Sequence, residues 1–395
     1  MALPLFLPCA AGVEALLAEE VQRILPKQRV HEARGGVALE GEPLEVMTLN
    51  LESRLAQRVL IEVAHGSYRD EGDVYELARA VAWSEWITPQ HTLRVDTTAH
   101  RSPLKSLNFA ALRVKDAVCD VLREATGERP SVDTRHPDLQ LVLHLGEQEV
   151  TLYVDSSGES LFKRGWRGTP EQGGALHDPC CGSGTIAIEA AQIACGIAPG
   201  LKRRFAFERL LPFVSDALRA ELQRLRSHAQ ARIHASAVPI FASDVSFRMV
   251  DFARRNAQRA GVEAAITFNG GDALERPAPV LPADLPGTVM INPPYGERIE
   301  VAGKAARPTG QARDAEDPDN RSATSDFFPR LATHWKRAYT QHPAGWTAYV
   351  LSPDMKLPGA MRLKESRRVP MWNGPIECRL FRFDLVAGSA RGPRS

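Results

Sequence analysis

The tetrapeptide Asn292-Pro293-Pro294-Tyr295 has the clearest chemical meaning in this sequence. Prolines stiffen the chain and lack N–H groups, so the carbonyls before them can accept hydrogen bonds from a substrate. An amino group on an aromatic ring is a weak nucleophile because its lone pair is delocalised. Hydrogen bonds to the Asn292 side-chain oxygen and to a carbonyl near Pro293 would aim that lone pair at a methyl donor. Tyr295 would stack on the base. The alternative is a proline-rich turn after a core strand.

A second motif is the run Asp178-Pro179-Cys180-Cys181-Gly182-Ser183-Gly184-Thr185. It joins an expected strand, 175–177, to an expected helix, 185–195. Glycine has no Cβ, so the backbone N–H groups of such a turn can approach a ligand closely. Asp178, Cys180, Gly182 and Gly184 are therefore candidates for binding a nucleotide-like cofactor. By itself the turn could equally be a tight connection between strand and helix.

Two acidic residues follow the next two expected strands. Asp244 ends the expected strand 240–243, where nucleotide-binding folds present a carboxylate to the ribose hydroxyls. The spacing from Gly184 exceeds the usual ~20 residues because residues 196–238 are inserted. Asp272 could face an adenine amino group after the strand 266–268, and Asn292 lies where it could also contact the cofactor. The alternatives are a helix N-cap for Asp244 and a turn aspartate for Asp272.

The elements around these motifs alternate between strand and helix after residue 175. This pattern is typical of a doubly wound parallel α/β sheet. Further strands are expected at 288–291 and 347–351, helices at 247–260 and 326–339, and a closing hairpin at Asn373-Gly374. Residues 301–325 lack periodicity and are expected to form a loop. We divide the chain into an α+β lobe (1–45), a second α+β domain (46–158), a junction (159–174) and the α/β domain (175–395). Helical patterns are expected at 13–24, 44–62, 73–82 and 107–123, and strands at 37–39, 92–96, 139–145 and 149–154.

Composition excludes several classes of protein. A chain with 44% hydrophobic and 25% charged residues is expected to be globular rather than disordered. Six cysteines without a CxxC pair predict reduced thiols and no metal site. No run approaches the ~20 apolar residues of a membrane-spanning helix, and the N-terminus lacks the basic start of a signal peptide. We expect a cytoplasmic protein without a membrane partner.

The net charge of +1 predicts no global attraction to nucleic acid, so any such surface must be local. Three groups of basic residues are candidates. Arg113 and Lys115 lie on the polar side of the helical pattern 107–123, and the run 202–204 lies in the insertion. The third group, in the junction, comprises Lys163, Arg164 and Arg167 with Trp166 as a stacking surface. Each group could instead be a solvated face.

Taken together, these motifs resemble the class I methyltransferases, and specifically the RlmL-type ribosomal RNA guanine-N2 methyltransferases that carry a THUMP domain. The resemblance rests on runs spread over nearly the whole chain: 11–17, 113–117, 155–161, 163–167, 178–185, 198–200, 292–298 and 373–375. It implies a ferredoxin-like N-terminal lobe, a THUMP domain that holds RNA, and a Rossmann-like domain that uses S-adenosylmethionine. The implied substrate is guanine N2 in 23S rRNA, in naked RNA or in a pre-ribosomal particle.

The chain departs from similar proteins in one segment. They carry a helix between the Gly-Trp-Arg run and the first sheet strand, whereas here only seven residues join Arg167 to Ala175. Larger members also have a second methyltransferase domain, so one methylation activity is expected here. Two rival functions follow from the residues. The first is methylation of DNA amino groups or of a protein glutamine. The second is a non-catalytic RNA-binding or assembly protein with a degenerate cofactor site.

Overall fold

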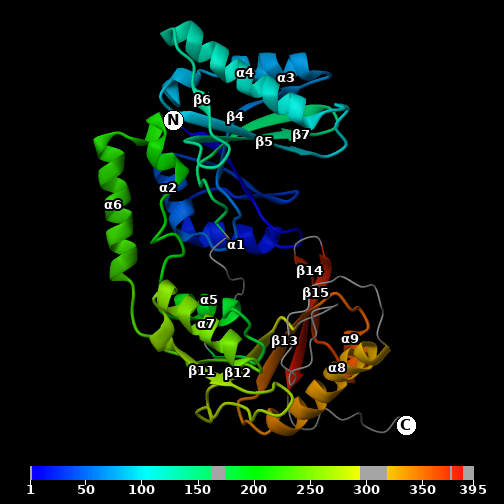
Figure 1. Cartoon of the computed structure of the whole chain (residues 1–395). Coiled ribbons are helices and arrows are strands. Elements are labelled where there is room, and N and C mark those ends of the chain that lie inside the picture. Colours follow the sequence, from blue (N-terminus) through cyan, green and yellow to red (C-terminus); the bar gives the residue numbers. More distant parts are fainter. Residues whose placement is uncertain (1, 162–173, 294–317, 374–375, 386–395) are drawn as a thin grey trace. The chain divides into compact units, whose positions relative to one another are not determined.

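A computed structural model of the chain describes residues 2–161, 174–293, 318–373 and 376–385 (Figure 1). Its contacts divide the chain into two compact units. The N-terminal unit comprises residues 1–164 together with 198–232, and the C-terminal unit comprises residues 165–197 and 233–395. Each unit contains its own sheet, and we describe the two separately.

The N-terminal unit is built on a mixed sheet with the strand order β2-β3-β1-β4-β8-β7-β5-β6. Leu5, Leu7 and Leu39 of this sheet are buried, as are Leu17 and Val21 of the first helix. The elements up to residue 155 are β1 (Leu3–Pro8), α1 (Glu14–Ile24), β2 (His31–Ala33), β3 (Gly36–Gly41), α2 (Pro43–Glu52), β4 (Leu60–Ser67), α3 (Glu71–Arg79), η1 (Trp83–Glu85), β5 (Thr92–Ala99), α4 (Leu107–Thr126), β6 (Ser131–Val132), β7 (Leu139–Leu145) and β8 (Glu149–Asp155).

Local signals explain where these helices begin and end. Ser106 caps α4 by accepting a hydrogen bond from the Phe109 N–H at 3.2 Å, and Gly127 ends the helix with a left-handed φ of 81°. We expected a helix over residues 44–62, and this prediction was wrong for the second half of the range. Helix α2 ends at Glu52, and Leu60 already pairs with Phe6 in the sheet. The spacing of apolar residues up to residue 62 fits a helix, but the pairing of Leu60 in the sheet places the end of this segment in a strand.

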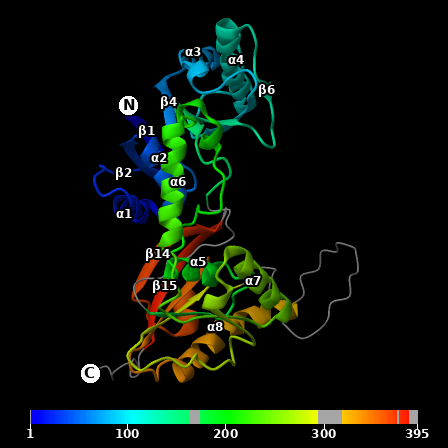
Figure 2. The same cartoon turned by 90° about the vertical axis from the view of Figure 1, so that its left-hand side faces the viewer.

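The inserted segment (residues 198–232) packs with the N-terminal unit, although its ends connect to elements of the C-terminal sheet. It contains η2 (Ala206–Arg209), η3 (Leu211–Phe213) and α6 (Asp216–Ala231), and Figure 2 shows α6 beside α2. Leu51 of α2, Ala198 and Ala229 form one buried apolar cluster. Sequence reasoning placed this segment in the C-terminal domain and expected no helix at α6. The difference arises because long-range apolar contacts decide which core a segment joins.

Hydrogen bonds attach the inserted segment along the N-terminal unit. The Gly200 N–H donates to the Leu51 carbonyl at 2.9 Å, and the Phe207 N–H donates to the Ser156 carbonyl at 2.9 Å. The Arg203 guanidinium donates to the carbonyls of Glu159, Ser160 and Leu161 at 2.7 to 3.2 Å. Burial lowers the pKa of Arg203. Arg203, which we grouped with possible RNA contacts, thus stabilises the last described turn of the N-terminal unit.

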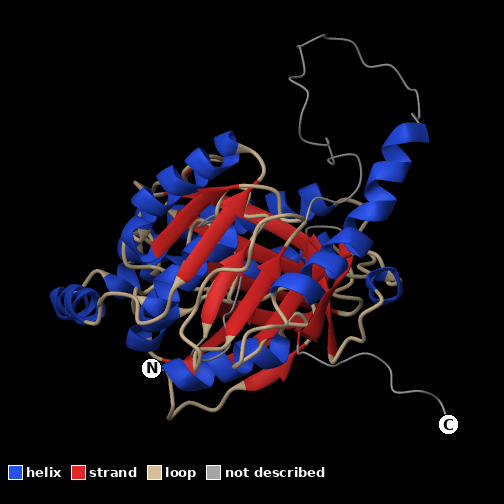
Figure 3. Cartoon of the chain, turned by 90° about the horizontal axis from the view of Figure 1, so that it is seen from below, coloured by secondary structure: helices blue, strands red, loops and turns tan. Residues whose placement is uncertain are grey.

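The C-terminal unit is a sheet with the strand order β11-β10-β9-β12-β13-β15-β14. Strands β11 to β13 are parallel, and β15 runs antiparallel to β13 and β14. Figure 3, with strands in red and helices in blue, shows helices lying along the sheets. The elements are β9 (Ala175–Asp178), α5 (Thr185–Ala194), β10 (Ile240–Asp244), α7 (Phe247–Ala260), η4 (Glu263–Ala265), β11 (Ile266–Gly270), β12 (Gly287–Ile291), α8 (Pro318–Ala338), β13 (Trp346–Ser352), α9 (Leu357–Met361), β14 (Arg367–Asn373) and β15 (Ile376–Leu385).

Two apolar cores lie on the two faces of this sheet. One contains α5 and α7, for example Ile188 and Ala253, and the other contains α8, for example Leu331 and Trp335. The expected strands, the helix over 247–260 and the closing hairpin, in which Asn373 pairs with Ile376, are confirmed. Helix α8 begins at Pro318, inside the loop expected over 301–325, and the rest of that loop lies outside the described residues.

We predict that residues 1–167 do not form a stable domain alone, because the inserted segment supplies part of their core. Its Phe207 stacks on Phe205 with ring centroids 5.4 Å apart and packs at a tilt against Phe213 at 5.3 Å, and all three rings are buried. Loss of such burial costs several kcal/mol, or ~10 °C in melting temperature. A fragment with 198–232 joined to residue 167 through a Gly-Ser linker should melt cooperatively. Equal melting of the two fragments by circular dichroism would contradict this prediction.

Candidate active site

The predicted site residues of the C-terminal unit meet at one edge of its sheet. Asp178, Asp244 and Asn292 stand at or directly after the carboxyl ends of β9, β10 and β12, and Asp272 follows β11 by two residues. Because these four strands are parallel neighbours, their carboxyl ends share this edge. Open parallel sheets bind ligands there, where adjacent helices leave a crevice. The structure therefore brings together motifs separated by more than a hundred residues.

Asp244 connects the glycine turn to its own strand. One carboxylate oxygen accepts the Gly182 N–H at 3.0 Å, and the other accepts the Ser246 N–H at 2.9 Å. The Asp244 carbonyl accepts the Gly271 N–H at 3.0 Å, which ties in the loop after β11. A carboxylate has about four lone-pair positions, so Asp244 keeps acceptor capacity for a ligand. It does not cap α7, because the capping residue of that helix is Ser246.

Glycine is required at the two positions of the turn for different structural reasons. Gly182 has φ of 51°, and a Cβ there would meet nothing within 4 Å, so the space beside it is open. Gly184 has φ of 87°, and a Cβ there would lie 2.9 Å from the Ala253 Cβ. Gly184 thus lets α5 and α7 approach each other, while the Asn256 side chain donates to the Ser183 carbonyl at 2.7 Å. The turn is held from both sides and open at Gly182.

Asp178 is a buried carboxyl group at the end of β9, 1% exposed. Its Oδ1 accepts the Cys180 N–H at 3.3 Å. Burial raises the pKa of Asp178 to about 8, and the nearby Asp244 acts in the same direction. A buried carboxyl group of this kind is stabilised as an anion when a positively charged ligand group lies beside it.

The two adjacent cysteines of the motif point into different cores. Cys181 belongs to the apolar cluster with α5 and α7, whereas Cys180 packs against the cluster with α8. Burial raises the pKa of both thiols above the ordinary value. A nucleophilic cysteine needs a lowered pKa, so this geometry gives the pair a packing role. All six cysteines of the chain are free.

Asn292 and Pro293 are the last described residues of the proline motif. The Asn292 side chain is exposed at the edge, and Pro293 is buried directly behind it. A proline ring fixes its own φ and restricts the residue before it, so Pro293 limits the conformations open to Asn292. Pro294 and Tyr295 lie outside the described residues, and their predicted roles stay predictions.

Asp272 makes the turn that sequence reasoning allowed as its alternative. Its Oδ1 accepts the Leu274 N–H at 2.9 Å, and its carbonyl accepts the N–H groups of Glu275 and Arg276. The carboxylate keeps a second oxygen for a ligand, so the predicted contact to an adenine stays a prediction.

Sequence reasoning missed a polar cluster beneath the edge. His177 is buried on β9, with Nδ1 at 2.8 Å from the Tyr339 hydroxyl and Nε2 at 3.4 Å from Ser243 Oγ. Burial lowers the pKa of His177 to about 3, so the imidazole is neutral at physiological pH. The three side chains link β9 and β10 to Tyr339, the residue directly after α8. The only sequence signal was a histidine in an otherwise apolar strand, next to a motif.

Phe247 is a second residue that sequence reasoning did not single out. It begins α7, three residues after Asp244, and is 78% exposed. Its ring packs against Gly270, the last residue of β11, so closely that a Cβ on Gly270 would lie 2.3 Å from Phe247 Cε1. An exposed ring between the ends of β10 and β11 suits stacking on a planar heterocycle. The signal in the sequence was a large aromatic residue at a helix start directly after an acidic strand end.

The predicted RNA contacts of the N-terminal unit take part in contacts within α4 or between α3 and α4. The Arg113 guanidinium lies 4.3 Å from the centroid of the Tyr75 ring, and the Tyr75 hydroxyl donates to Asp120 at 2.9 Å. Lys115 Nζ is 2.5 Å from an Asp116 carboxylate oxygen. Both basic side chains are part-exposed, so their RNA role stays a prediction. Lys163, Arg164 and Arg167 lie outside the described residues, as does the segment where the helix of similar proteins is expected to be missing.

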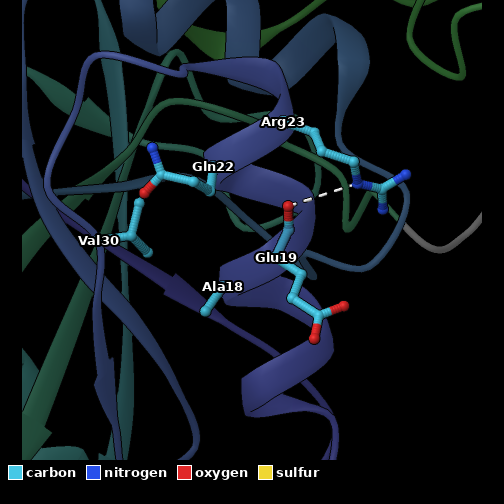
Figure 4. A pocket seen from close by; sticks show the side chains of 5 residues that line it. All are labelled: Ala18, Glu19, Gln22, Arg23 and Val30. Atoms are coloured by element: carbon cyan, nitrogen blue, oxygen red, sulfur yellow. Dashed lines mark hydrogen bonds between the residues drawn. The ribbon is translucent and has the colours of Figure 1, made fainter.

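The described residues carry a further open pocket, which contains none of the predicted site residues. This pocket lies on α1 and is lined by Ala18, Glu19, Gln22, Arg23 and Val30 (Figure 4). No group of three or more His, Cys, Asp or Glu side chains in the described part could hold a metal ion. None of the described helices is long and apolar enough to cross a membrane.

This sheet order, with an antiparallel strand beside five parallel ones and acidic residues at the strand ends, defines a class I methyltransferase fold. Family models support this class. A model of an RMKL-like methyltransferase domain matches residues 167–307, a THUMP model matches 68–155, and a model of the RlmL ferredoxin-like domain matches 4–60. The chain thus carries an RlmL-type ferredoxin-like domain, a THUMP domain and an RMKL-like methyltransferase domain.

Curated relatives agree with this assignment. The ribosomal RNA large subunit methyltransferase K/L of Syntrophotalea carbinolica is 34% identical, over 96% of this chain and 53% of that protein. The protein of the same name from Pseudomonas entomophila is 32% identical, over 96% of this chain and 52% of that protein. The chain thus spans about half the length of the curated relatives it matches.

Solved structures show the same fold. SMU.472, crystallised with SAH, has a TM-score of 0.80 at 23% identity, covering 97% of this chain and 98% of that one. A predicted N6-adenine-specific DNA methylase from Listeria monocytogenes has a TM-score of 0.78 at 25% identity, covering 97% and 96%. TrmN from Thermus thermophilus has a TM-score of 0.63 at 18% identity, covering 97% and 100%.

We predict that Asp178 makes the protein less stable as pH rises. Its raised pKa means that the folded state binds a proton between about pH 4 and 8 that the unfolded state releases. The stabilisation is complete below the unfolded pKa and is lost as pH rises toward about 8. Asp178→Asn should remove this loss. The free energy of unfolding of the variant should therefore rise relative to that of the natural protein from pH 5 to 8, by on the order of a few kcal/mol, and its melting temperature should rise with it. Parallel melting curves at all pH values would show that Asp178 is not protonated in the fold.

Proposed function

We propose that this chain transfers a methyl group from S-adenosylmethionine to an exocyclic amino group of a base in RNA. The proposed substrate is guanine N2 of 23S rRNA. One observation carries the proposal: Asn292 stands at the end of β12, next to the strand ends that bear Asp178 and Asp244. A planar amino group of the substrate can therefore bind beside a nucleotide-like cofactor at this edge of the sheet. The match to a THUMP model and the names of the curated relatives favour RNA as the substrate.

The described residues suit the cofactor. Asp178 offers a buried carboxyl group beside an open glycine turn, and Asp244 has spare acceptor positions next to it. We assign the ammonium group of the cofactor's amino acid end to Asp178, its carboxylate to the glycine turn, and its ribose to Asp244. Cys180, Gly182 and Gly184 supply backbone to the pocket, Asp272 and Phe247 flank the adenine, and Asn292 borders the reacting group. When bound, S-adenosylmethionine supplies a methyl group on a positive sulfur, which a neutral nitrogen can attack.

The chain's own part in the reaction is orientation. The Asn292 side-chain oxygen and the carbonyl before the second proline accept hydrogen bonds from the two N–H groups of the base. These bonds favour a tetrahedral nitrogen with its lone pair outside the ring plane. Pro293 limits the conformations open to Asn292, because a proline restricts the residue before it. The proton leaves the nitrogen after transfer, when the nitrogen is positively charged and acidic, so water can accept it.

Two rival functions make different predictions. A DNA amino methyltransferase, the activity that the name of the Listeria monocytogenes neighbour indicates for that protein, would methylate DNA and leave RNA unmethylated. A non-catalytic RNA-binding protein would keep the N-terminal unit and bind no cofactor. Incubation with labelled S-adenosylmethionine and RNA from cells lacking the protein, followed by nucleoside analysis, separates all three. We expect the product to be N2-methylguanosine. In the cell, we expect the reaction to take place in the cytoplasm, on naked rRNA or on a pre-ribosomal particle.

Asn292→Ala should lower turnover roughly 10²–10³-fold, because it removes the acceptor that orients the nitrogen. Cofactor affinity, measured by calorimetric titration, should stay within about threefold, since the nitrogen contact forms only with the base bound. Asn269→Ala, a matched loss of an amide in β11, is the control and should keep its activity. Near-normal methylation by the Asn292 variant would remove this residue from the mechanism.

Phe247→Ala should weaken cofactor binding roughly 5- to 100-fold, the range expected for loss of one aromatic stacking partner of a base. RNA affinity should not change, because the ring lies at the cofactor end of the edge. Phe252→Ala is the control on the same helix, since that side chain is 38% exposed and lies against Arg248. Equal cofactor dissociation constants for both variants would assign Phe247 to packing alone.

A further inference from the structure

Helix α8 has one face that its packing does not explain. Leu331, Ala332, Trp335 and Tyr339 are buried against the sheet. Arg330, Thr333 and Arg337 are exposed and follow one another at spacings of three and four residues, so they share a side of the helix. A groove runs along this side, bounded by the segment after β11. Its lining residues, which we call the α8 groove, are Leu274, Pro329, Arg330, Thr333, His334 and Arg337.

The charge of the groove is positive. Neither Arg330 nor Arg337 forms an ion pair with any side chain in the described part of the protein. The acidic residues on the facing segment are Asp272 and Glu275, and Asp272 already accepts the Leu274 N–H. Many other exposed arginines pair with a carboxylate one helical turn away, as Arg255 does with Asp251 at 2.6 Å. Two unpaired arginines on one face are therefore available to an anion.

The floor of the groove is tied to the candidate active site. His334 is 4% exposed, and its Nε2 donates to the Arg276 carbonyl at 2.7 Å. The Arg276 guanidinium in turn donates to the carbonyl of Gly270, the last residue of β11, at 2.7 Å. The other ring nitrogen, Nδ1, is buried without a partner among the described residues. A short chain of bonds thus fixes the groove against the segment that carries Asp272.

We propose that the α8 groove binds phosphate groups of the RNA strand whose base enters the active site. This inference rests on the proposed function. Arginine suits the role because its planar guanidinium matches two phosphate oxygens at once. Arg330 and Arg337 are seven residues apart, about 10.5 Å along the helix, so the two guanidinium groups can contact different phosphates of one strand. Leu274 and Pro329 form apolar walls that suit the sugars. Thr333 is not a donor here, because its hydroxyl bonds to the Pro329 carbonyl at 2.9 Å.

The test compares Arg330→Gln/Arg337→Gln with a control that loses the same charge elsewhere. The control is Arg254→Gln/Arg255→Gln on α7, whose core lies on the opposite face of the sheet. Binding of the full chain to 23S rRNA made by transcription is measured from 50 to 300 mM salt. Each lost phosphate contact should reduce the slope of log affinity against log salt by about 0.7, so the groove variant should lose about 1.4. The control slope and both cofactor affinities should stay unchanged.

Each other outcome overturns the inference in a recognisable way. If the natural protein methylates the rRNA and the groove variant keeps its salt slope, the groove does not contact RNA and the proposed function stands. If the natural protein neither binds nor methylates the rRNA, the proposed function fails and the inference fails with it. If millimolar inorganic phosphate raises the melting temperature of the natural protein but not of the groove variant, while both keep the same RNA slope, the groove is a site for free anions.

Discussion

The hydrogen bonds of Asp244 are the interaction on which the candidate site depends. Its two carboxylate oxygens and its carbonyl accept the N–H groups of Gly182, Ser246 and Gly271. Three loops from three neighbouring strands are therefore fixed to a single residue. Because backbone N–H groups are obligatory donors, their pairing with Asp244 removes the conformational freedom that would otherwise leave the pocket unformed. The same carboxylate keeps acceptor positions for a cofactor. One side chain therefore both fixes the loops and offers hydrogen-bond acceptors to a ligand.

Buried polar groups around this edge are arranged so that they remain neutral without a ligand. The pKa of Asp178 is raised and the pKa of His177 is lowered, both by burial. The neutral imidazole of His177 is satisfied by Tyr339 and Ser243, whereas Asp178 faces the glycine turn. Arrival of a positive group near Asp178 would favour its ionisation, and a proton would leave as the ligand binds.

The inserted segment couples the two halves of the chain by connectivity. It leaves the C-terminal sheet after α5 and returns to it before β10, the two elements that flank the glycine turn and Asp244. Between these points it completes the core of the N-terminal unit through Leu51, Ala198 and Ala229. The N-terminal unit, for which we propose RNA binding, therefore requires residues that belong in sequence to the catalytic half. Neither half is a contiguous stretch of sequence.

Much of the candidate site follows from sequence because its chemistry depends on residue type and on local order. A strand followed by glycines or by an acidic residue, and a strand followed by Asn292, can be recognised one at a time, since periodicity and turn residues are local properties. Their meeting at one edge also follows, because parallel strands align their carboxyl ends. The tertiary structure alone decided the rest. The pairing of Leu60 ended a helix, and the inserted segment joined the distant core. Arg203 turned inward to bind backbone carbonyls, and Phe247 and the α8 groove came to lie near Asp244 and Asp272. Each of these depends on contacts between residues far apart in the chain, and no local pattern encodes such contacts.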